Sequence, residues 1–374
     1  MPSDISAPSK RPTENALYGL RGVAIMYVLV SHVGNAGLPL FPIPHSAIGK
    51  VGVWIFFTLS AFLLTNNLVH RLRTSQSRLH EIAGFTVHRV FRIYPLYTFV
   101  LLLHIFLAGL SYQDALKHLL LTEGRGELWA IPVEFTYYLC IPLIAMGFIW
   151  CTERGGRVAT ILFLAALPTL AIISTATCEP SSIFSNDLAL FPKLAPFLIG
   201  SLLGLLDERL RGRLSASTTP SLVSGIALAI LVIATVIYRD IHTKNLYATF
   251  TPLLSLALSV SASGLLFSAL YDPYLRAVLR LRALVMIGEI SFSVYLLHMF
   301  FISAISSFSG IPAALQSWLC ILVVLPVSLV SFYLIEKPGI QFGRNLANRI
   351  PIAHAGYRAH PRQSSDEDVM CHCK

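Results

Sequence analysis

Apolar residues occur in long, nearly uninterrupted blocks, and short polar segments separate one block from the next. A helix needs about 20 mainly apolar residues to cross the roughly 30 Å hydrocarbon core of a bilayer. The blocks have this length, so the pattern predicts an all-α protein that crosses a membrane about ten times. The predicted spans are residues 17–34, 49–68, 94–110, 128–150, 157–176, 188–206, 219–238, 247–270, 284–306 and 313–336.

The composition excludes an ordinary water-soluble domain. The chain has 374 residues, of which 55% are hydrophobic and 13% are charged, and its mean hydropathy is +0.68. Soluble globular chains carry about 25% Asp, Glu, Lys and Arg, so too little polar surface is available here to cover a soluble body. The formal net charge of +9 does not indicate a nucleic-acid binder, because the basic residues lie between the apolar blocks.

Basic residues are distributed unequally between alternate loops. If the N-terminus is cytoplasmic, 21 of the 28 Lys and Arg residues fall on the cytoplasmic side and 5 on the other, while Arg21 and Lys193 fall inside spans. Cytoplasmic loops of membrane proteins carry an excess of Lys and Arg. We therefore expect both termini in the cytoplasm, with an N-terminal tail at 1–16, a membrane domain at 17–338 and a disordered C-terminal tail at 339–374.

The longest internal loop precedes the third span and contains an amphipathic segment at 82–93. Its apolar residues follow helical spacing, which predicts a helix lying on the inner leaflet. Pro95 is then expected to begin the third span, because proline fits the first turn of a helix.

The six cysteines do not predict a disulfide framework, because they are scattered and lie mostly in or beside apolar blocks. Cys371-His372-Cys373 lacks the spacing and the second ligand pair of a structural zinc site, and we predict no metal. The first apolar block lacks a small-x-small cleavage pattern, so we interpret it as an uncleaved span.

Two polar residues share one face of the first span. Arg21 and His32 are eleven residues apart, which corresponds to about 16 Å of rise and three turns plus about 20°. A charged side chain in a span costs about 2.5–3.5 kcal/mol on insertion scales, so a partner or a wet cavity is expected. The alternatives are that Arg21 reaches the inner headgroups and that His32 only caps the outer end.

Polar residues also interrupt the fourth and ninth spans. Glu134 is expected about 9 Å below the outer surface, with Tyr137 and Tyr138 on its face. On a continuous ninth helix, His298 lies about 21 Å from the inner end. His32, Glu134 and His298 are thus expected in the outer half of the bilayer. The alternative for Glu134 is a structural hydrogen bond to another helix, and the alternative for His298 is a core histidine bonded to a carbonyl.

Arginines gather at the opposite, inner end. Arg89 and Arg92 are i,i+3 neighbours in the amphipathic segment, and Arg71 and Arg73 end the second span. Arginine binds phosphate through two parallel hydrogen bonds, so the cluster suggests a phosphorylated ligand from the cytoplasm. Binding of lipid headgroups explains Arg71, Arg73 and Arg78 well, and it stays open as the alternative for Arg89 and Arg92.

Six motifs occur in order across residues 17–338. They are Gly19-Leu20-Arg21-Gly22-Val23-Ala24 with His32; Gly52 to Leu63 (GVWIFFTLSAFL); His88 to Tyr97 (HRVFRIYPLY); Leu128 to Phe135 (LWAIPVEF); Ile290 to His298 (ISFSVYLLH); and Tyr333 to Pro338 (YLIEKP). Together they resemble the acyltransferase type 3 family, membrane-bound enzymes that O-acetylate carbohydrates and some small molecules. Trp54 departs from the acidic residue that the family often has there, so no role is borrowed for this position.

The resemblance implies a multi-pass protein of the bacterial plasma membrane that takes an acetyl group from cytoplasmic acetyl-CoA. It also implies a carbohydrate acceptor, and membrane lipid surrounds the spans. We expect His32 to act as the general base on an acceptor hydroxyl, a role that needs a side chain titrating near neutral pH. Glu134 is expected to hold the His32 tautomer, and Arg21 to organise the donor or the base from below.

The remaining candidate residues are expected to bind ligands. Arg89 and Arg92 are expected to hold the phosphates of acetyl-CoA, and Trp129, Tyr138 and His298 to contact the substrate. With no appended hydrolase-like domain expected, transfer must finish within the helix bundle or pass to a separate partner.

Two alternatives stay open. In the mechanism, His32 could itself carry the acetyl group as a covalent intermediate. In function, a proton-coupled transporter or flippase of a sugar or lipid-linked intermediate could use the same His and Glu residues as a proton relay.

Overall fold

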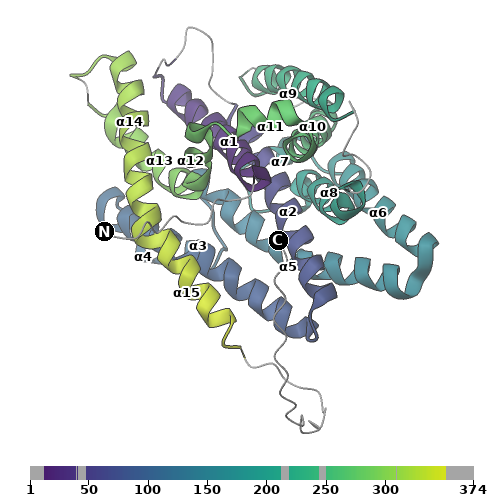
Figure 1. The fold of residues 1–374 in the computed structure, drawn as a ribbon. Helices are drawn as coiled ribbons and strands as arrows, with labels where there is room; N and C mark the ends of the chain where they lie inside the picture. The colour runs from purple at the N-terminus through teal and green to yellow at the C-terminus, as the bar shows by residue number, and fades with distance from the viewer. Residues whose placement is uncertain are drawn as a thin grey trace, which may run out of the picture.

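The computed structural model describes residues 12–38, 40, 48–211, 219–243, 250–308 and 310–350. Within these residues the secondary structure is helical and includes no strand, so the predicted all-α class is confirmed (Figure 1). The outer parts of both predicted tails, with Cys371-His372-Cys373, lie outside the described residues.

Within the described residues, each of the ten predicted spans is mainly helical; residues 247–249 of the eighth span lie outside them. The α-helices are α1 (Pro12–Asn35), α2 (Gly49–Thr74), α3 (Arg78–Ala108), α4 (Tyr112–Leu119), α5 (Ala130–Trp150), α6 (Gly156–Ala176), α7 (Pro180–Ile183), α8 (Leu194–Arg211), α9 (Thr219–Thr243), α10 (Thr251–Tyr271), α11 (Pro273–Leu279), α12 (Arg282–Glu289), α13 (Ser291–Ser306), α14 (Ala313–Ser331) and α15 (Lys337–Ala347). Short 3-10 helices lie at η1 (Gly126–Trp129) and η3 (Phe191–Lys193), and π-helical turns at η2 (Cys151–Gly155) and η4 (Phe332–Glu336).

By length and apolarity, seven helical stretches of the described chain are able to cross a membrane, or eight with the bent pair α12–α13. One stretch, Gly126–Ala176, has 51 residues and contains both α5 and α6. At about 1.5 Å per residue it is more than twice as long as the hydrocarbon core is thick. The α8 segment was also predicted as a span, but four charged residues in its last five positions reduce its apolar length.

The third span begins much earlier than expected. α3 is one helix of 31 residues that runs through Pro95, so the separate surface helix at 82–93 is wrong. Pro95 removes one backbone donor from the helix but does not end it. Gly339 of α15 packs at this point, where a Cβ atom would lie 3.0 Å from the Phe91 carbonyl oxygen and 2.8 Å from Pro95 Cγ.

The ninth predicted span is broken. α12 and α13 meet at Ile290 with a bend of 76°, so the height of His298 derived from a straight helix is wrong. α12 also lies very close to α1. A Cβ atom on Gly22 would be 2.3 Å from the Leu284 carbonyl oxygen, and one on Gly288 would be 1.8 Å from the Tyr18 carbonyl oxygen. Small residues permit such close helix packing.

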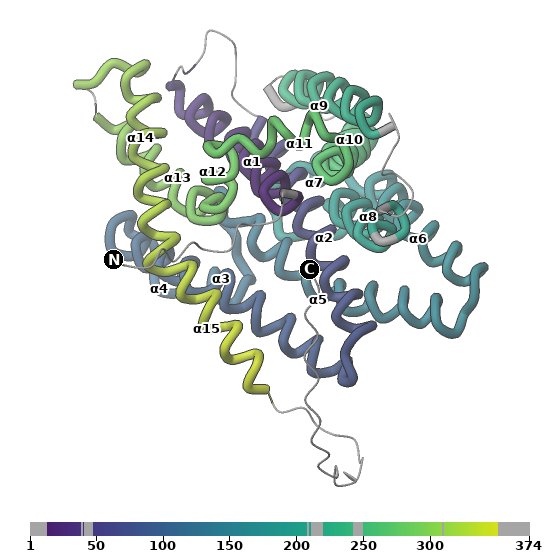
Figure 2. The backbone as a smooth tube through the Cα atoms, in the orientation of Figure 1, coloured from purple at the N-terminus to yellow at the C-terminus, as the bar shows by residue number. Residues whose placement is uncertain are grey.

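The core lies around α2, which packs against α1, α5, α8 and α10. α10 also packs against α9, and α6 against α8 (Figure 2). α15 continues the chain beyond residue 338 as a helix and packs along α3, so the packed structure extends beyond the domain boundary that we expected. α1 and α2 therefore lie between α13 on one side and α8 and α10 on the other.

Candidate active site

His32 on α1 and His298 on α13 form a hydrogen-bonded pair. His32 Nδ1 lies 2.7 Å from His298 Nε2, and the ring centroids are 4.8 Å apart. The second nitrogen of His298, Nδ1, lies 2.7 Å from the Tyr295 carbonyl oxygen and 3.2 Å from that of Val294. His298 is completely buried behind His32.

The partners of these rings determine where the hydrogens lie. A carbonyl oxygen only accepts, so Nδ1 of a neutral His298 carries the hydrogen and its Nε2 is an acceptor. His32 Nδ1 therefore donates to His298 Nε2. This assignment leaves the lone pair of His32 on Nε2, which is the nitrogen able to accept a proton from a ligand.

A cavity of about 460 Å³ lies beside His32, and we call it the histidine cavity. Its wall combines the end of α1, the start of α2, η1 and Tyr295 of α13. Trp129 supplies an aromatic surface, while Lys50 and Asn186 supply polar groups. A few polar groups among aromatic side chains are typical of sites for small organic ligands.

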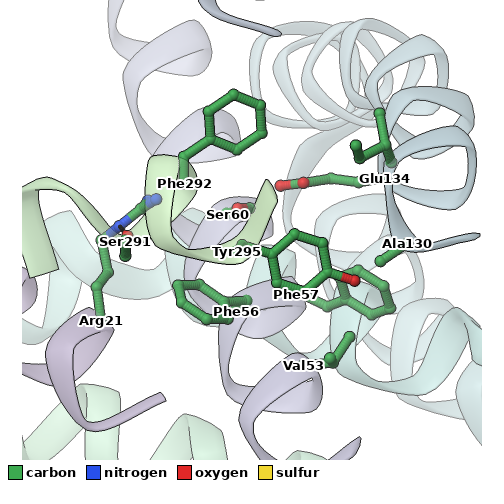
Figure 3. Close-up of a pocket in the computed structure, with 11 residues that line it drawn as sticks. Arg21, Val53, Phe56, Phe57, Ser60, Ala130, Glu134, Ser291, Phe292 and Tyr295 are labelled. Carbon is green, nitrogen blue, oxygen red and sulfur yellow. Dashed lines mark hydrogen bonds between the residues drawn. The ribbon is translucent and has the colours of Figure 1, made fainter. Parts of the chain in front are cut away.

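A narrow cavity of about 50 Å³, which we call the neck, adjoins the histidine cavity. Figure 3 shows Glu134 directed into the neck from α5, across from Arg21 and Ser291. Arg21 Nε donates to Ser291 Oγ at 3.2 Å, and its guanidinium lies 5.5 Å from the Phe56 ring centroid. Arg21 and His32 both contact α13, so their predicted common face on α1 is confirmed.

A third cavity, of about 630 Å³, lies near the start of α1, and we call it the basic cavity. Its charged lining consists of five cations and two carboxyl groups: Arg21, Arg89, Arg92, Lys337 and Arg344, with Glu14 and Glu289. A neighbouring cavity of about 200 Å³ shares three of these arginines and adds Arg71 and His88. The basic cavity is therefore suited to a ligand with several negative charges.

The three cavities form one series through the bundle. The basic cavity and the neck share Arg21, and the neck and the histidine cavity share Val53 and Tyr295. Along α1 the series extends from Arg21 to His32, about 16 Å apart. The three cavities are thus neighbours, and their order suits an extended ligand with its charged end in the basic cavity and its tip near His32.

The two predicted phosphate-binding arginines differ in their partners. Arg92 forms an ion pair with Glu336, whose carboxylate is completely buried and also accepts from Ser293 Oγ at 2.6 Å. Arg89 lies over the Tyr138 ring at 5.9 Å, and its buried Nε has no hydrogen-bond partner within the described chain. The unsatisfied donor makes Arg89 the better candidate for an anionic ligand, because buried donors are normally paired.

The other predicted residues fall in different places. Trp129 lines the histidine cavity with His32, whereas Glu134 lines the neck and does not contact the His32 ring. Tyr138 is buried beneath Arg89 and interacts with Glu134. Tyr137 does not share the face of Glu134 as expected, because its hydroxyl lies 2.7 Å from Ser201 Oγ of α8.

Sequence reasoning missed Lys50, Lys337 and Arg344 as cavity residues. Lys337 and Arg344 are seven residues apart on α15, a spacing that returns to nearly the same helix face. That spacing was a usable signal, but the segment was interpreted as the start of a tail. The described residues contain no group of three or more His, Cys, Asp or Glu side chains that could hold a metal ion.

Comparison with known proteins identifies the family. The family model described as "Acyltransferase domain" matches residues 14–337, and the chain therefore belongs to the acyltransferase type 3 family. The resemblance carried by the six motifs is thereby confirmed.

Two curated relatives have related names at low identity. The chain is 23% identical over 364 residues to the O-acetyltransferase OatA of Staphylococcus aureus, covering 86% of this chain and 56% of that protein. It is 24% identical over 220 residues to an O-acetyl transferase of Shigella phage Sf6, covering 50% of this chain and 61% of that protein. The chain thus spans about three fifths of the length of these relatives. No solved structure matches it.

Proposed function

We propose that this protein is an O-acetyltransferase of the plasma membrane that moves an acetyl group from acetyl-CoA to a hydroxyl of a carbohydrate. The series of three cavities, with five cations at one end and His32 at the other, is the observation that carries the proposal. The names of the two relatives support the acetyl group. In this proposal the donor enters through the basic cavity and the acceptor through the histidine cavity.

The acceptor hydroxyl is activated by His32. Nε2 of His32 takes the hydroxyl proton as the oxygen attacks the thioester carbonyl carbon. The carbon–sulfur bond then breaks, the sulfur leaves as the thiolate of CoA, and the imidazolium returns the proton to it. The products are an O-acetyl ester and free CoA, and His32 is regenerated.

His298 takes the orienting role that we expected of Glu134. Its Nε2 accepts from His32 Nδ1, which keeps the lone pair of His32 on the nitrogen that faces the ligand. An orienting group of this kind fixes the base in the required tautomer. Glu134 and Arg21 act instead in the neck, where the acetyl group has to pass.

The donor phosphates are bound by the cations of the basic cavity. The buried Nε of Arg89 has no hydrogen-bond partner among the described residues, and Arg344 and Lys337 extend the site onto α15. Arg92 contributes charge at the wall while its ion pair with Glu336 holds α3 against η4.

Mass spectrometry of glycans from cells with and without this protein tests the proposal. We expect one acetyl group per modified sugar only when the protein is present, and we expect purified protein to release CoA from acetyl-CoA in the presence of that glycan. A transporter would move its substrate without consuming acetyl-CoA, so activity without CoA release would contradict the proposal.

A further inference from the structure

Lys50 is the second residue of α2 and lines the histidine cavity. Its ammonium donates to the Ser185 carbonyl oxygen at 3.1 Å and to Asn186 Oδ1 at 2.5 Å, and lies 3.5 Å from the Trp129 ring centroid. All three partners are neutral. In the part of the chain that the structure describes, no carboxylate forms an ion pair with Lys50. Asp187 acts on it only over a longer distance, and the carboxyl group of Glu127 lines the same cavity.

A second lysine, Lys193, lies beside the same tryptophan and differs from Lys50 in having an acidic partner. Lys193 Nζ lies 5.6 Å from the Trp129 ring centroid, but it donates to Asp187 Oδ1 at 2.5 Å. Burial alone would raise the pKa of Asp187, and the hydrogen bonds from Lys193 and Ser185 lower it below its usual value. Lys193 therefore has an ionised partner in direct contact, whereas Asp187 acts on Lys50 only electrostatically, without an ion pair.

The position of Lys50 on its helix is electrostatically unfavourable. The N-terminus of a helix carries partial positive charge, so a cation in the first turn is repelled and an anion is attracted. Ile48 precedes the helix and provides no side-chain cap for the first N–H groups of α2. A lysine beside uncapped helix N–H groups, inside a cavity, is an arrangement that binds anions.

An unpartnered hydroxyl completes the arrangement. Ser31 is 1% exposed and lines the histidine cavity, yet its Oγ has no hydrogen-bond partner among the described residues. Gly49, the first residue of α2, lies beside it, since a Cβ atom there would be 3.3 Å from Ser31 Oγ and 3.9 Å from His32 Cε1. Ser31, Lys50 and the start of α2 thus converge next to the His32 ring.

We propose that this end of the histidine cavity binds a negatively charged group carried by the acceptor, a carboxylate or a phosphate. The proposal rests on the proposed function in that it assigns the histidine cavity to the acceptor. The anion would receive hydrogen bonds from Lys50, from the Ser31 hydroxyl and from the first N–H groups of α2. The acceptor class is then an acidic or phosphorylated carbohydrate, held with a hydroxyl near His32.

A binding measurement in the absence of acetyl-CoA tests whether the histidine cavity holds an anion. The full-length protein in lipid nanodiscs is titrated with glucuronate, glycerol 3-phosphate or neutral glucose at constant ionic strength, and tryptophan fluorescence is recorded because Trp129 contacts Lys50. We expect a saturable change with at least one anion and none with glucose, and the anion that binds distinguishes carboxylate from phosphate. The assay contains no acetyl-CoA, so its failure and the failure of the proposed transferase are distinguishable.

Variants of Lys50 and Ser31 test whether these residues bind the anion. Lys50→Met should weaken anion binding at least tenfold, Lys50→Arg should retain it, and Ser31→Ala should weaken it by a smaller factor. Lys117→Met is the matched control, because Lys117 is an exposed lysine of α4 that pairs with Asp114 outside the cavity. The proposal is overturned if neither anion gives a saturable change, or if Lys50→Met binds as tightly as the unmodified protein. A site that served only the reacting acetyl group would give the first of these results.

Discussion

Replacing His298 by phenylalanine should slow acetyl transfer without weakening donor binding. Phenylalanine preserves a ring of similar size against His32, but it removes the acceptor for His32 Nδ1 at 2.7 Å. Without that acceptor, His32 prefers the tautomer that places its hydrogen on Nε2, and this form cannot act as the base. Glutamine at 298 offers a carbonyl oxygen to His32 Nδ1 and should recover part of the rate.

The size of the effect follows from the cost of the lost hydrogen bond. A buried donor left without a partner costs about 1–3 kcal/mol, which lowers the population of the active tautomer about 5- to 150-fold. We expect kcat to fall by this factor while the KM for acetyl-CoA stays unchanged, because the basic cavity is not altered. The measurement is CoA release by purified protein at saturating donor, with the acetylated glycan quantified in parallel.

A matched control separates this effect from general damage to the fold. Among the described residues, the His104 ring of α3 hydrogen-bonds only to the Val100 carbonyl oxygen of its own helix, at 2.9 Å, so His104→Phe should leave kcat near that of the unmodified protein. Normal turnover in His298→Phe would refute the reasoning, and so would a loss that appears only in the KM for acetyl-CoA. Equal losses in the phenylalanine and glutamine variants would show that hydrogen bonding to His32 is not the cause.

Three further predictions follow from the basic cavity and the orientation. Arg89→Ala should raise the KM for acetyl-CoA, and Arg89→Lys should recover part of the affinity, because charge returns without the two-pronged geometry; unchanged donor affinity would return Arg89 to a lipid-headgroup role. Arg92→Ala should destabilise the fold by about 3 kcal/mol, since it leaves the Glu336 carboxylate buried without its partner, and thermal unfolding should recover when Glu336→Gln is added. Tags at both termini should resist external protease in intact cells, because the positive-inside bias puts both ends in the cytoplasm; cleavage of either tag would refute that orientation.

The positions of the helices were predictable because the bilayer imposes a length on apolar segments. Within the described residues, each of the ten apolar blocks lies within or overlaps a helix of the structure. The points at which helices continue or bend were not predictable from hydropathy. Helix α3 passes through Pro95, and the chain bends at Ile290, which is itself apolar. Both features depend on packing against other helices, α15 at Pro95 and α1 at α12.

The candidate site was predictable in its composition and less so in its contacts. Helical spacing correctly put Arg21 and His32 on one face, since both belong to one uninterrupted helix. The partner of His32 was not predictable, because the sequence does not say which helix faces α1. Glu134 had the right chemistry for an orienting group, but the bend before α13 brings His298 to His32 instead.

The lysine and serine of the histidine cavity were missed for a related reason. Lys50 looked like one of the few basic residues of an external loop, and Ser31 like an ordinary polar residue near a helix end. Their meaning depends on what surrounds them, namely two neutral hydrogen-bond acceptors for Lys50 and no partner for Ser31 Oγ within the described residues.

The central claim is that His32 is the base for acetyl transfer, and the His32→Gln variant tests it most directly. Glutamine retains size and hydrogen bonding but cannot accept a proton at neutral pH. Cells that carry only this variant should contain it in the membrane, purified variant should bind acetyl-CoA as tightly as the unmodified protein, and O-acetylation of the glycan should fall by about 10²- to 10⁴-fold. Near-normal acetylation by a correctly inserted His32→Gln protein would contradict the claim.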